Sequence, residues 1–414
     1  HRAIDSFYDY PRVQGLAEMM NSYGVIHNDP EVVSKIVASQ AHHKKIDGHA
    51  PGLQGKDLDT YVAAGVYSDH ECATMEDALA KLQRGQFIMI REGTAARNLE
   101  ALAPLLTPQY AERCMFCTDD KHPSDLLEKG HIDYIAREAI NKYGVDPIIA
   151  VKAACHHASR YFLLNNRGAI APGYLADFAV IDNFKDFNVE MVFKKGVLYW
   201  NNGELRDFEA PKIEEYLDKR AHDTFHVSTL TPDDFRDTRQ RGVLGMVPGE
   251  IITTDNGYAD HVDLEKDILK IAVVERHKGT HHIGLGYIQG YGLKSGAVAT
   301  SISHDSHNII VVGTNSADMA FAANYIVEHH GGIVVVENGT VKGDVVLEIA
   351  GIMSDRPLTE VNDQLEAAKD AAFTLGVSRG IDPFMTLSFM ALPVIPKLRI
   401  TTRGVIDVDT QQYV

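Results

Sequence analysis

One unit sets the pattern for the first half of the chain. It consists of KIDGH at residues 45–49, a helical stretch that runs through Leu58 and Tyr61 to Gly65, and VYSDHE at residues 66–71. Both short runs carry apolar residues near their start and end in polar ones. Short strand-like runs that alternate with amphipathic helical stretches indicate parallel strands joined by helices.

The same pattern extends in both directions from this unit. VQGLAE at 13–18 precedes it, and FIMIRE at 87–92 and CMFCTDD at 114–120 follow it, with helical stretches at 132–140 and 147–161. Five such units favour a parallel sheet covered by helices, which is either a doubly wound sheet or a (β/α)₈ TIM-type barrel. Five strands are too few to close a barrel. Because the chain starts at His1 rather than at Met, we expect the remaining strands to precede it in a longer protein.

The pattern changes near Gly168 to short strand-like runs separated by turns, which predicts a small β unit. A charged stretch at 214–220 is typical of a surface helix in a linker. From about His226 onward, apolar runs at 309–312 and 333–336 and a helical stretch between them indicate a second, mixed α/β domain. The predicted divisions are the later part of the barrel at 1–165, a small β segment at 166–206, a linker at 207–225 and a C-terminal α/β domain at 226–414.

Composition excludes several classes of protein. The chain of 414 residues carries 40 Lys and Arg against 57 Asp and Glu, which gives a net charge of −17. This acidic balance argues against a nucleic-acid or membrane-surface protein, because phosphate binding requires a basic face. No apolar run reaches the length of about 18 residues that a membrane span needs. Four cysteines in so long a chain do not form a disulfide framework, and we expect a cytoplasmic protein.

Residues with acid, base or metal-ligating side chains stand at the ends of the predicted strands. In parallel-sheet folds the carboxyl ends of the strands form the edge where ligands and catalytic groups gather. Any one of these residues, taken alone, also fits a hydrogen-bonded loop position or a helix cap. Together they suit a divalent ion bound by imidazole and carboxylate groups. They are Glu18, His49, His70, Glu71, Glu92, Asp119 and Asp120.

Two further patterns admit a second interpretation. Cys114 and Cys117 form a C-x-x-C pair, but residues three apart face opposite sides of a strand, so we expect core cysteines rather than a zinc or redox pair. The motif SHDSHN at 303–308 contains His304, Asp305 and His307. It fits a polar lid or site component and a hydrogen-bonded turn equally well.

Several of these motifs, taken together, resemble one known family. They are LAEMM at 16–20, DGHAPGL at 47–53, HE at 70–71, IREG at 90–93, CTDD at 117–120 and SHDSHN at 303–308. The combination resembles the adenine deaminases of the amidohydrolase superfamily, and the resemblance runs over essentially the whole chain. Residues 168–177 are similar to the return from the barrel into the small β domain that many amidohydrolases share.

The resemblance implies a binuclear metal centre at the mouth of a (β/α)₈ barrel. Glu18 would bridge two divalent ions, His49 and His70 would ligate the second ion, and Asp119 would bind metal and carry the proton. Iron or manganese is favoured, with zinc as the alternative. A metal-bound hydroxide would attack C6 of adenine and release hypoxanthine and ammonia, a reaction of purine salvage and adenine catabolism. Adenine is the implied partner, and we expect a homo-oligomer.

Secondary roles follow from the same resemblance. Glu71, Glu92 and Asp120 would orient ligands or the purine ring, and His304, Asp305 and His307 would contact the substrate or cover the site. The family's first-strand His-x-His pair has no counterpart in this sequence. Two alternatives therefore stay open. One is another binuclear amidohydrolase acting on a cyclic amide, many of which carry a carboxylated Lys where this chain has Glu18, and the other is a non-catalytic chain that keeps the scaffold.

Overall fold

The computed structural model describes residues 2–94, 96–209, 211–237, 239–247 and 250–414. The chain divides into two compact units, His1–Ala210 (unit 1) and Pro211–Val414 (unit 2), which are described separately. The predicted divisions at 165/166, 206/207 and 225/226 stay predictions.

Unit 1 alternates strands with helices along most of its length. Its five parallel strands are β1 (Gly15–Met19), β2 (Lys45–Gly48), β3 (Ser68–Asp69), β4 (Phe87–Arg91) and β5 (Cys114–Cys117). The α-helices are α1 (Arg2–Phe7), α2 (Ser22–Ile26), α3 (Pro30–Ala41), α4 (Gly55–Ala63), α5 (Met75–Gln83), α6 (Leu99–Leu102), α7 (Pro123–Glu128), α8 (Ile132–Asn141), α9 (Pro147–Val151) and α10 (His157–Tyr161). The short turns are η1 (Ala103–Leu105), η2 (Ala111–Arg113) and the π-turn η3 (Lys152–His156).

Local sequence explains where these helices begin. Asp29 caps α3 by accepting the backbone N–H of Glu31 at 2.9 Å, and Pro30 takes the first helical position, where its missing N–H costs nothing. Thr74 caps α5 by accepting from Asp77 N at 3.2 Å. In a capping box the Asp77 side chain would accept the backbone N–H of Thr74 in return. Asp77 Oδ2 instead accepts from Lys81 Nζ at 3.1 Å.

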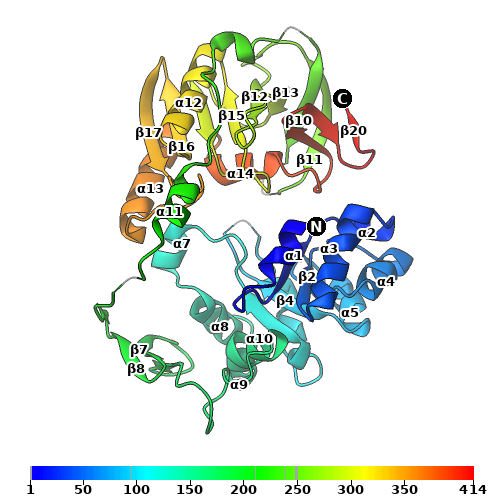
Figure 1. Cartoon of the computed structure of the whole chain (residues 1–414), viewed down its shortest axis with the longest axis vertical. Helices are drawn as coiled ribbons and strands as arrows, with labels where there is room; N and C mark the ends of the chain where they lie inside the picture. The colour runs from blue at the N-terminus through cyan, green and yellow to red at the C-terminus, as the bar shows by residue number, and fades with distance from the viewer. Residues whose placement is uncertain (1, 95, 210, 238, 248–249) are drawn as a thin grey trace. The chain divides into compact units, whose positions relative to one another are not determined.

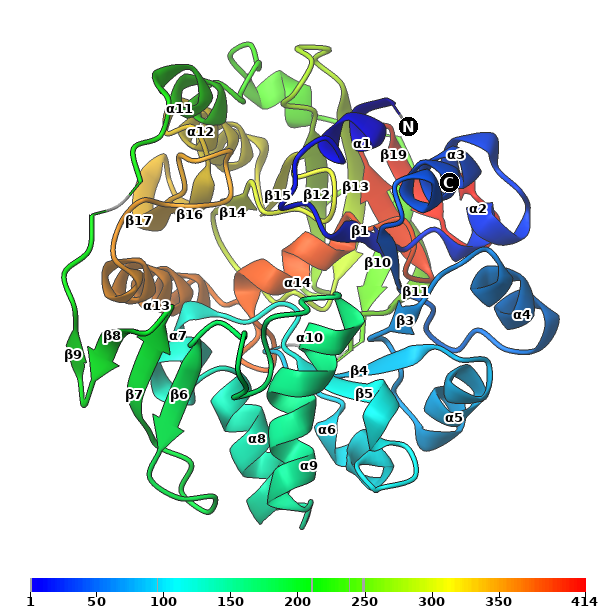
Figure 2. The same ribbon diagram turned by 60° about the horizontal axis from the view of Figure 1, so that its bottom comes forward.

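The five strands form two hydrogen-bonded groups. β1 pairs with β2, and β3, β4 and β5 pair in that order with helices packed beside them (Figure 2). Apolar side chains on these strands, such as Ile46 of β2 and Ile88 and Ile90 of β4, are fully buried. The expected mixed α/β fold is therefore confirmed, and within the described residues the strands do not close into a barrel.

The small β unit follows as an antiparallel sheet. Its strands pair in chain order (Figure 2) and are β6 (Phe178–Ile181), β7 (Val189–Lys194), β8 (Val197–Asn201) and β9 (Glu204–Leu205). The rings of Phe178 and Phe193 stack across the first pair, with centroids 4.7 Å apart. Cross-strand aromatic pairs of this kind stabilise antiparallel sheets.

Unit 2 is built on an eight-stranded sheet in the order β11-β10-β13-β12-β15-β14-β16-β17. The strands are β10 (Arg241–Met246), β11 (Thr253–Ala259), β12 (Ile268–Val274), β13 (Ile283–Gln289), β14 (Ala297–Thr300), β15 (Ile309–Gly313), β16 (Gly332–Glu337) and β17 (Thr340–Val346). A second sheet contains β18 (Leu398–Thr401), β19 (Gly404–Asp407) and β20 (Gln412–Tyr413). The helical segments are α11 (Glu215–His222), η4 (Pro232–Phe235), α12 (Ser316–Glu328), α13 (Leu358–Thr374) and α14 (Pro383–Met390).

Helices bury both faces of the eight-stranded sheet, which appears with α12, α13 and α14 in Figure 1. Ile310 and Val312 belong to one core cluster with residues of α13 and α14, whereas Ile309 and Val311 belong to the other with residues of α12. Alternate residues of a strand point to opposite faces, so a strand covered on both sides has to be apolar throughout. This explains the unbroken apolar run at 309–312.

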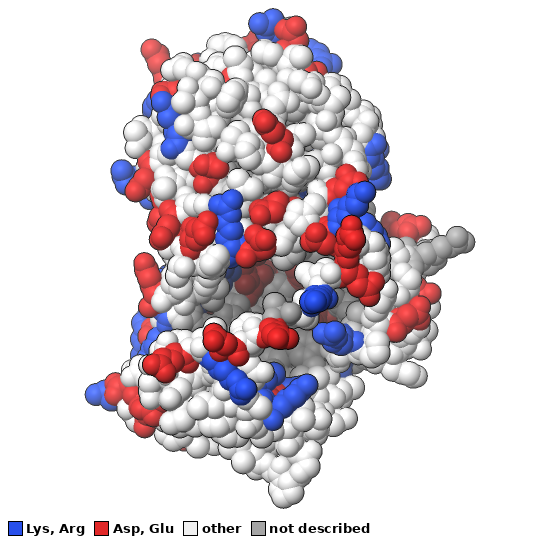
Figure 3. Space-filling model, turned by 60° about the vertical axis from the view of Figure 1, so that its left-hand side comes forward, with Lys and Arg blue, Asp and Glu red and all other residues white. Residues whose placement is uncertain are grey.

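None of the helices in the described part of the chain has the length and hydrophobicity that a membrane crossing needs. On the face shown in Figure 3, the Lys and Arg side chains are dispersed among Asp and Glu.

Candidate metal centre

Three of the predicted residues meet where β1, β2 and β3 end. The parallel register pairs Met19 of β1 with Gly48 of β2, which places Glu18 next to His49. Glu18 Oε2 lies 3.5 Å from His49 Nδ1 and 2.9 Å from His70 Nε2. The His49 and His70 side chains are only 9% and 12% exposed. The three side chains offer one carboxylate oxygen and two ring nitrogens within 4.8 Å of one another.

The Glu18 carboxylate and the neighbouring His70 imidazole shift each other's pKa values. Burial raises the pKa of Glu18, but the adjacent imidazoles of His49 and His70 outweigh it and hold the pKa at about 2. Burial lowers the pKa of His70, and Glu18 more than reverses this, raising the pKa to about 9. The charged forms of Glu18 and His70 thus stabilise each other.

Two buried polar atoms of this group lack a hydrogen-bond partner among the described residues. Within the described residues, Glu18 Oε2 and His49 Nδ1 are buried and have no hydrogen-bond partner of acceptable geometry. Buried polar atoms are rarely unpaired in folded proteins, and a lone-pair donor in this position suits a cation. The donor set and its unpaired atoms therefore fit a divalent metal ion.

A second group continues from His70 to Glu71 and Asp119. Glu71 Oε1 lies 3.4 Å from His70 Nε2, and one donor atom from each of His70, Glu71 and Asp119 lies within 4.8 Å of the others. Asp119 follows β5, has φ of 54° and is 37% exposed, which makes it the most accessible member of the two groups. Asp is one of the few residues that tolerate this left-handed backbone conformation.

Arg91 connects the two carboxylates of the second group. Its Nη1 contacts Glu71 Oε1 and donates to Asp119 Oδ2 at 2.7 Å, and its side chain is 6% exposed. Burial lowers the pKa of Arg91, but the Glu71 and Asp119 carboxylates raise it overall. Sequence reasoning assigned no role to Arg91, because a lone basic residue at the end of a strand reads as a surface residue.

Glu92 and Asp120 lie outside these metal-compatible groups. Glu92 Oε2 accepts the backbone N–H of Leu99 at 3.3 Å, at the first residue of α6, and burial raises its pKa. The Asp120 carbonyl accepts from Thr94 N at 2.9 Å. The geometry thus makes Glu92 a helix-terminus residue, and the ligand-orienting role expected of these two residues stays a prediction.

His304, Asp305 and His307 belong to unit 2 and form a hydrogen-bonded turn between β14 and β15. His304 Nδ1 pairs with Asp305 Oδ1 at 2.8 Å, and its ring stacks on Phe389 with an interplanar angle of 9°. His307 Nδ1 accepts from Ser303 N at 3.2 Å. The turn is thus present, and the role of these residues over the site stays a prediction.

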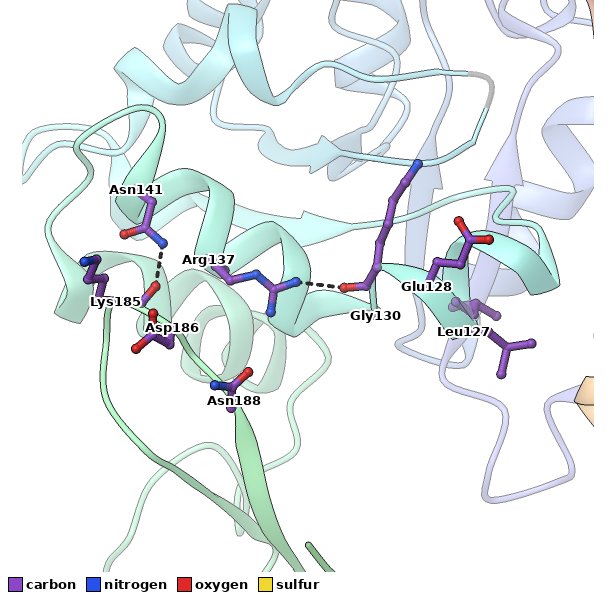
Figure 4. Close-up of a pocket in the computed structure, with 10 residues that line it drawn as sticks. Leu127, Glu128, Gly130, Arg137, Asn141, Lys185, Asp186 and Asn188 are labelled. Atoms are coloured by element: carbon purple, nitrogen blue, oxygen red, sulfur yellow. Dashed lines mark hydrogen bonds between the residues drawn. The ribbon is translucent and has the colours of Figure 1, made fainter. Parts of the chain in front are cut away.

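A separate surface hollow of about 560 Å³ lies between α7, α8 and the loop that follows β6. Figure 4 shows the polar side chains that surround it, including Arg137, Asn141 and Asp186. The residues that line this hollow include none of the predicted site residues, so it is distinct from the two metal-compatible groups.

Comparisons with known proteins cover both units. Residues 12–199 match the model of the amidohydrolase family, and residues 250–412 match that of the adenine deaminase C-terminal domain. The chain is 45% identical to an adenine deaminase of Desulfatibacillum aliphaticivorans over 99% of this chain and 72% of that protein. It is 43% identical to adenine deaminases of Kosmotoga olearia and Brucella anthropi, over 98% and 99% of this chain and 71% and 72% of those proteins.

Solved structures show a much weaker likeness. A β-aspartyl dipeptidase of Fervidobacterium islandicum AW-1 gives a TM-score of 0.41 at 17% identity, over 50% of this chain and 61% of that chain. The sequence relatives are far more similar and extend through both units. The resemblance noted in the sequence is thereby confirmed, and the chain belongs to the adenine deaminase family of the amidohydrolases.

Proposed function

We propose that this protein catalyses the hydrolytic deamination of adenine to hypoxanthine and ammonia at the edge formed by β1, β2, β3 and β5. The observation that carries the proposal is the convergence of Glu18, His49, His70 and Asp119 in a chain that is similar to adenine deaminases throughout. We further propose that the five parallel strands are units of a (β/α)₈ barrel.

Glu18, His49 and His70 would hold a divalent metal ion, and Asp119 would complete a second position beside His70 and Glu71. We favour two ions bridged by Glu18, with iron or manganese ahead of zinc, because the ligands are nitrogen and oxygen atoms without a thiolate. When bound, such ions lower the pKa of a water molecule towards neutrality and so supply a nucleophile for C6 of adenine.

Asp119 is the best placed residue to move the proton. It is the exposed carboxylate of the two groups, so it can reach both water and a purine. As a general base it takes the proton from the attacking water, and as a general acid it returns that proton to the ring or to the departing nitrogen. Water adds at C6, the bond from C6 to the exocyclic nitrogen breaks, and ammonia leaves.

Arg91 and Glu71 would position Asp119 rather than react. The Arg91 guanidinium pairs with both the Glu71 and the Asp119 carboxylates. This pairing would fix the direction of Asp119 Oδ2. Charge-assisted hydrogen bonds of this kind are stronger and more directional than neutral ones.

The test is an assay of ammonia and hypoxanthine release from adenine after loading the purified chain with Mn²⁺ or Fe²⁺, with metal content measured on the same sample. We expect bound metal and turnover of adenine. Hydrolysis of cyclic amides with adenine left intact would overturn the assignment in favour of another amidohydrolase activity, and metal uptake without either reaction would favour a non-catalytic scaffold. Self-association stays a prediction, which light scattering can check.

A further inference from the structure

The two histidines of the metal-compatible group come from strands that do not share a hydrogen-bonded sheet. β2 pairs with β1, β3 pairs with β4, and within the described residues β2 and β3 form no ladder. One backbone hydrogen bond, from Tyr67 N to Ile46 O at 2.9 Å, joins them before the strands end. Side chains make further links between the two segments, such as the hydrogen bond that Ser68 Oγ donates to Asp47 Oδ1 at 3.0 Å.

A buried lysine contacts both histidine-bearing segments. Lys81 lies on α5, and its side chain is 0% exposed. Its Nζ donates to Ala50 O at 2.7 Å and contacts Asp69 Oδ2, while Asp69 Oδ1 accepts from Ala50 N at 3.0 Å. Ala50 directly follows His49, and Asp69 directly precedes His70. Both histidine-bearing segments are thus tied to each other and to one ammonium group.

The remaining contacts keep Lys81 charged and in place. Asp77 Oδ2 accepts from Nζ at 3.1 Å, and Cys72 Sγ lies 3.5 Å from it. An ammonium group withdrawn from water is stable only when it is paired and hydrogen-bonded, which this site provides. The set Asp69, Cys72 and Asp77 could itself be taken for a metal site, but Lys81 already supplies the cation.

We propose that Lys81 is a positioning residue that holds His49 and His70 at metal-binding distance by bridging Ala50 and Asp69. The proposal rests on the proposed metal centre. Groups behind metal ligands commonly tune affinity in this way, and their loss typically weakens binding about 10- to 100-fold.

The test compares the Mn²⁺ affinity of the whole chain with that of Lys81→Met, by equilibrium dialysis or calorimetry. We expect the dissociation constant to rise about 10- to 100-fold. We also expect the amide of Ala50 to exchange hydrogen faster in the metal-free variant, because its acceptor Asp69 is no longer fixed. Saturating Mn²⁺ should restore much of kcat, since the reacting groups are unchanged.

A matched control is available in unit 2. Lys270 is also buried, and its Nζ donates to a backbone carbonyl, that of Phe235, at 2.9 Å. Lys270→Met removes a comparable ammonium group and should leave the Mn²⁺ affinity unchanged.

Lys81→Met leaves two buried carboxylates without their cation and could prevent folding. The double variant Lys81→Met/Asp77→Asn keeps the net charge of the cluster unchanged and is measured in the same way. Wild-type Mn²⁺ affinity in a folded Lys81 variant would overturn the proposed role of Lys81 alone. A wild-type chain that binds no Mn²⁺ would overturn the metal centre and this role with it.

Discussion

Buried cations are held differently in the two units. In unit 1, Arg91 and Lys81 contact carboxylates, and these carboxylates raise the pKa of both cations against the effect of burial. In unit 2, burial without a carboxylate partner lowers the pKa of Arg276 to about 10 and that of Arg399 to about 9.

The partners of the unit 2 arginines are largely backbone carbonyls. Arg276 donates to the carbonyls of Thr224, His307 and Ala350, and Arg399 donates to those of Ile251 and Pro396. A carbonyl satisfies an N–H group without supplying a countercharge, so these arginines tie loops together. The buried cations of unit 1 instead contact carboxylates near the carboxyl ends of the strands. The partner of a buried cation, a carbonyl or a carboxylate, thus separates the cations that connect loops from those that contact other charged groups.

The largest effect should follow from Glu18→Gln. An amide cannot bridge cations as a carboxylate does, so we expect turnover of adenine to fall below detection and metal content to drop, with the circular dichroism spectrum retained. Glu76→Gln, at an exposed position of α5, is the control and should behave as wild type. Turnover near the wild-type rate in Glu18→Gln would show that the unit 1 group is not the active centre.

Asp119→Asn should lower kcat by about 100- to 10,000-fold, the range for loss of a general acid and base. We expect the ion held by Glu18, His49 and His70 to stay bound, because these three ligands are unchanged. Steady-state kinetics and metal analysis on one preparation measure both quantities. An unchanged kcat would remove Asp119 from proton transfer.

Arg276→Met tests the role of a carbonyl-bound arginine in unit 2. Three carbonyls would lose a charged donor, so we expect the free energy of unfolding to fall by about 3 kcal/mol. Metal affinity should be unaffected. Urea unfolding provides the measurement, and Arg403→Met, at an exposed turn, should cost less than about 0.5 kcal/mol. A loss of metal binding without a loss of stability would reverse the proposed division between the two units.

The smallest effect concerns Asp237, a unit 2 carboxylate that does pair with arginines. Burial raises its pKa, but hydrogen bonds from Arg239 and Arg241 lower it overall, well below its usual value. Because the folded pKa lies below the unfolded one, the stabilisation is fully present above about pH 4 and is lost as the pH falls further. Asp237→Asn should therefore flatten the acid limb of stability against pH. Parallel curves for the two proteins would contradict this.

The strand-end positions of the candidate site residues could largely be predicted from the sequence, and their roles stay predictions. Glu18, His49, His70 and Asp119 follow apolar runs in the sequence, and parallel strands bring such ends to one edge. The same reasoning predicts a role for Glu92, which stays a prediction, and it gives no role to the preceding residue Arg91, which contacts Glu71 and Asp119. A strand alternates its side chains, so an error of one residue at its end changes the face.

Lys81 could not be predicted by the same means. It lies near the end of α5, shortly before Gln83 and Arg84, and a lysine in such a polar helix end is typical of a solvent-facing surface. Its burial depends on Asp69, which is 12 residues away and on a different element. The spacing of apolar residues and the composition describe one helix or strand at a time. A buried ion pair such as that of Lys81 and Asp69 depends on how two elements pack together.

The break in the ladder between β2 and β3 has a consequence for cooperativity. With one backbone hydrogen bond across it, this boundary has few main-chain bonds to lose, and local opening starts at such places. An ion held jointly by His49 and His70 would span the boundary and bind only the closed form. Binding of the ion would then stabilise the closed form against local opening. The free energy of opening would rise by about 2.7 kcal/mol at a free ion concentration 100 times the dissociation constant.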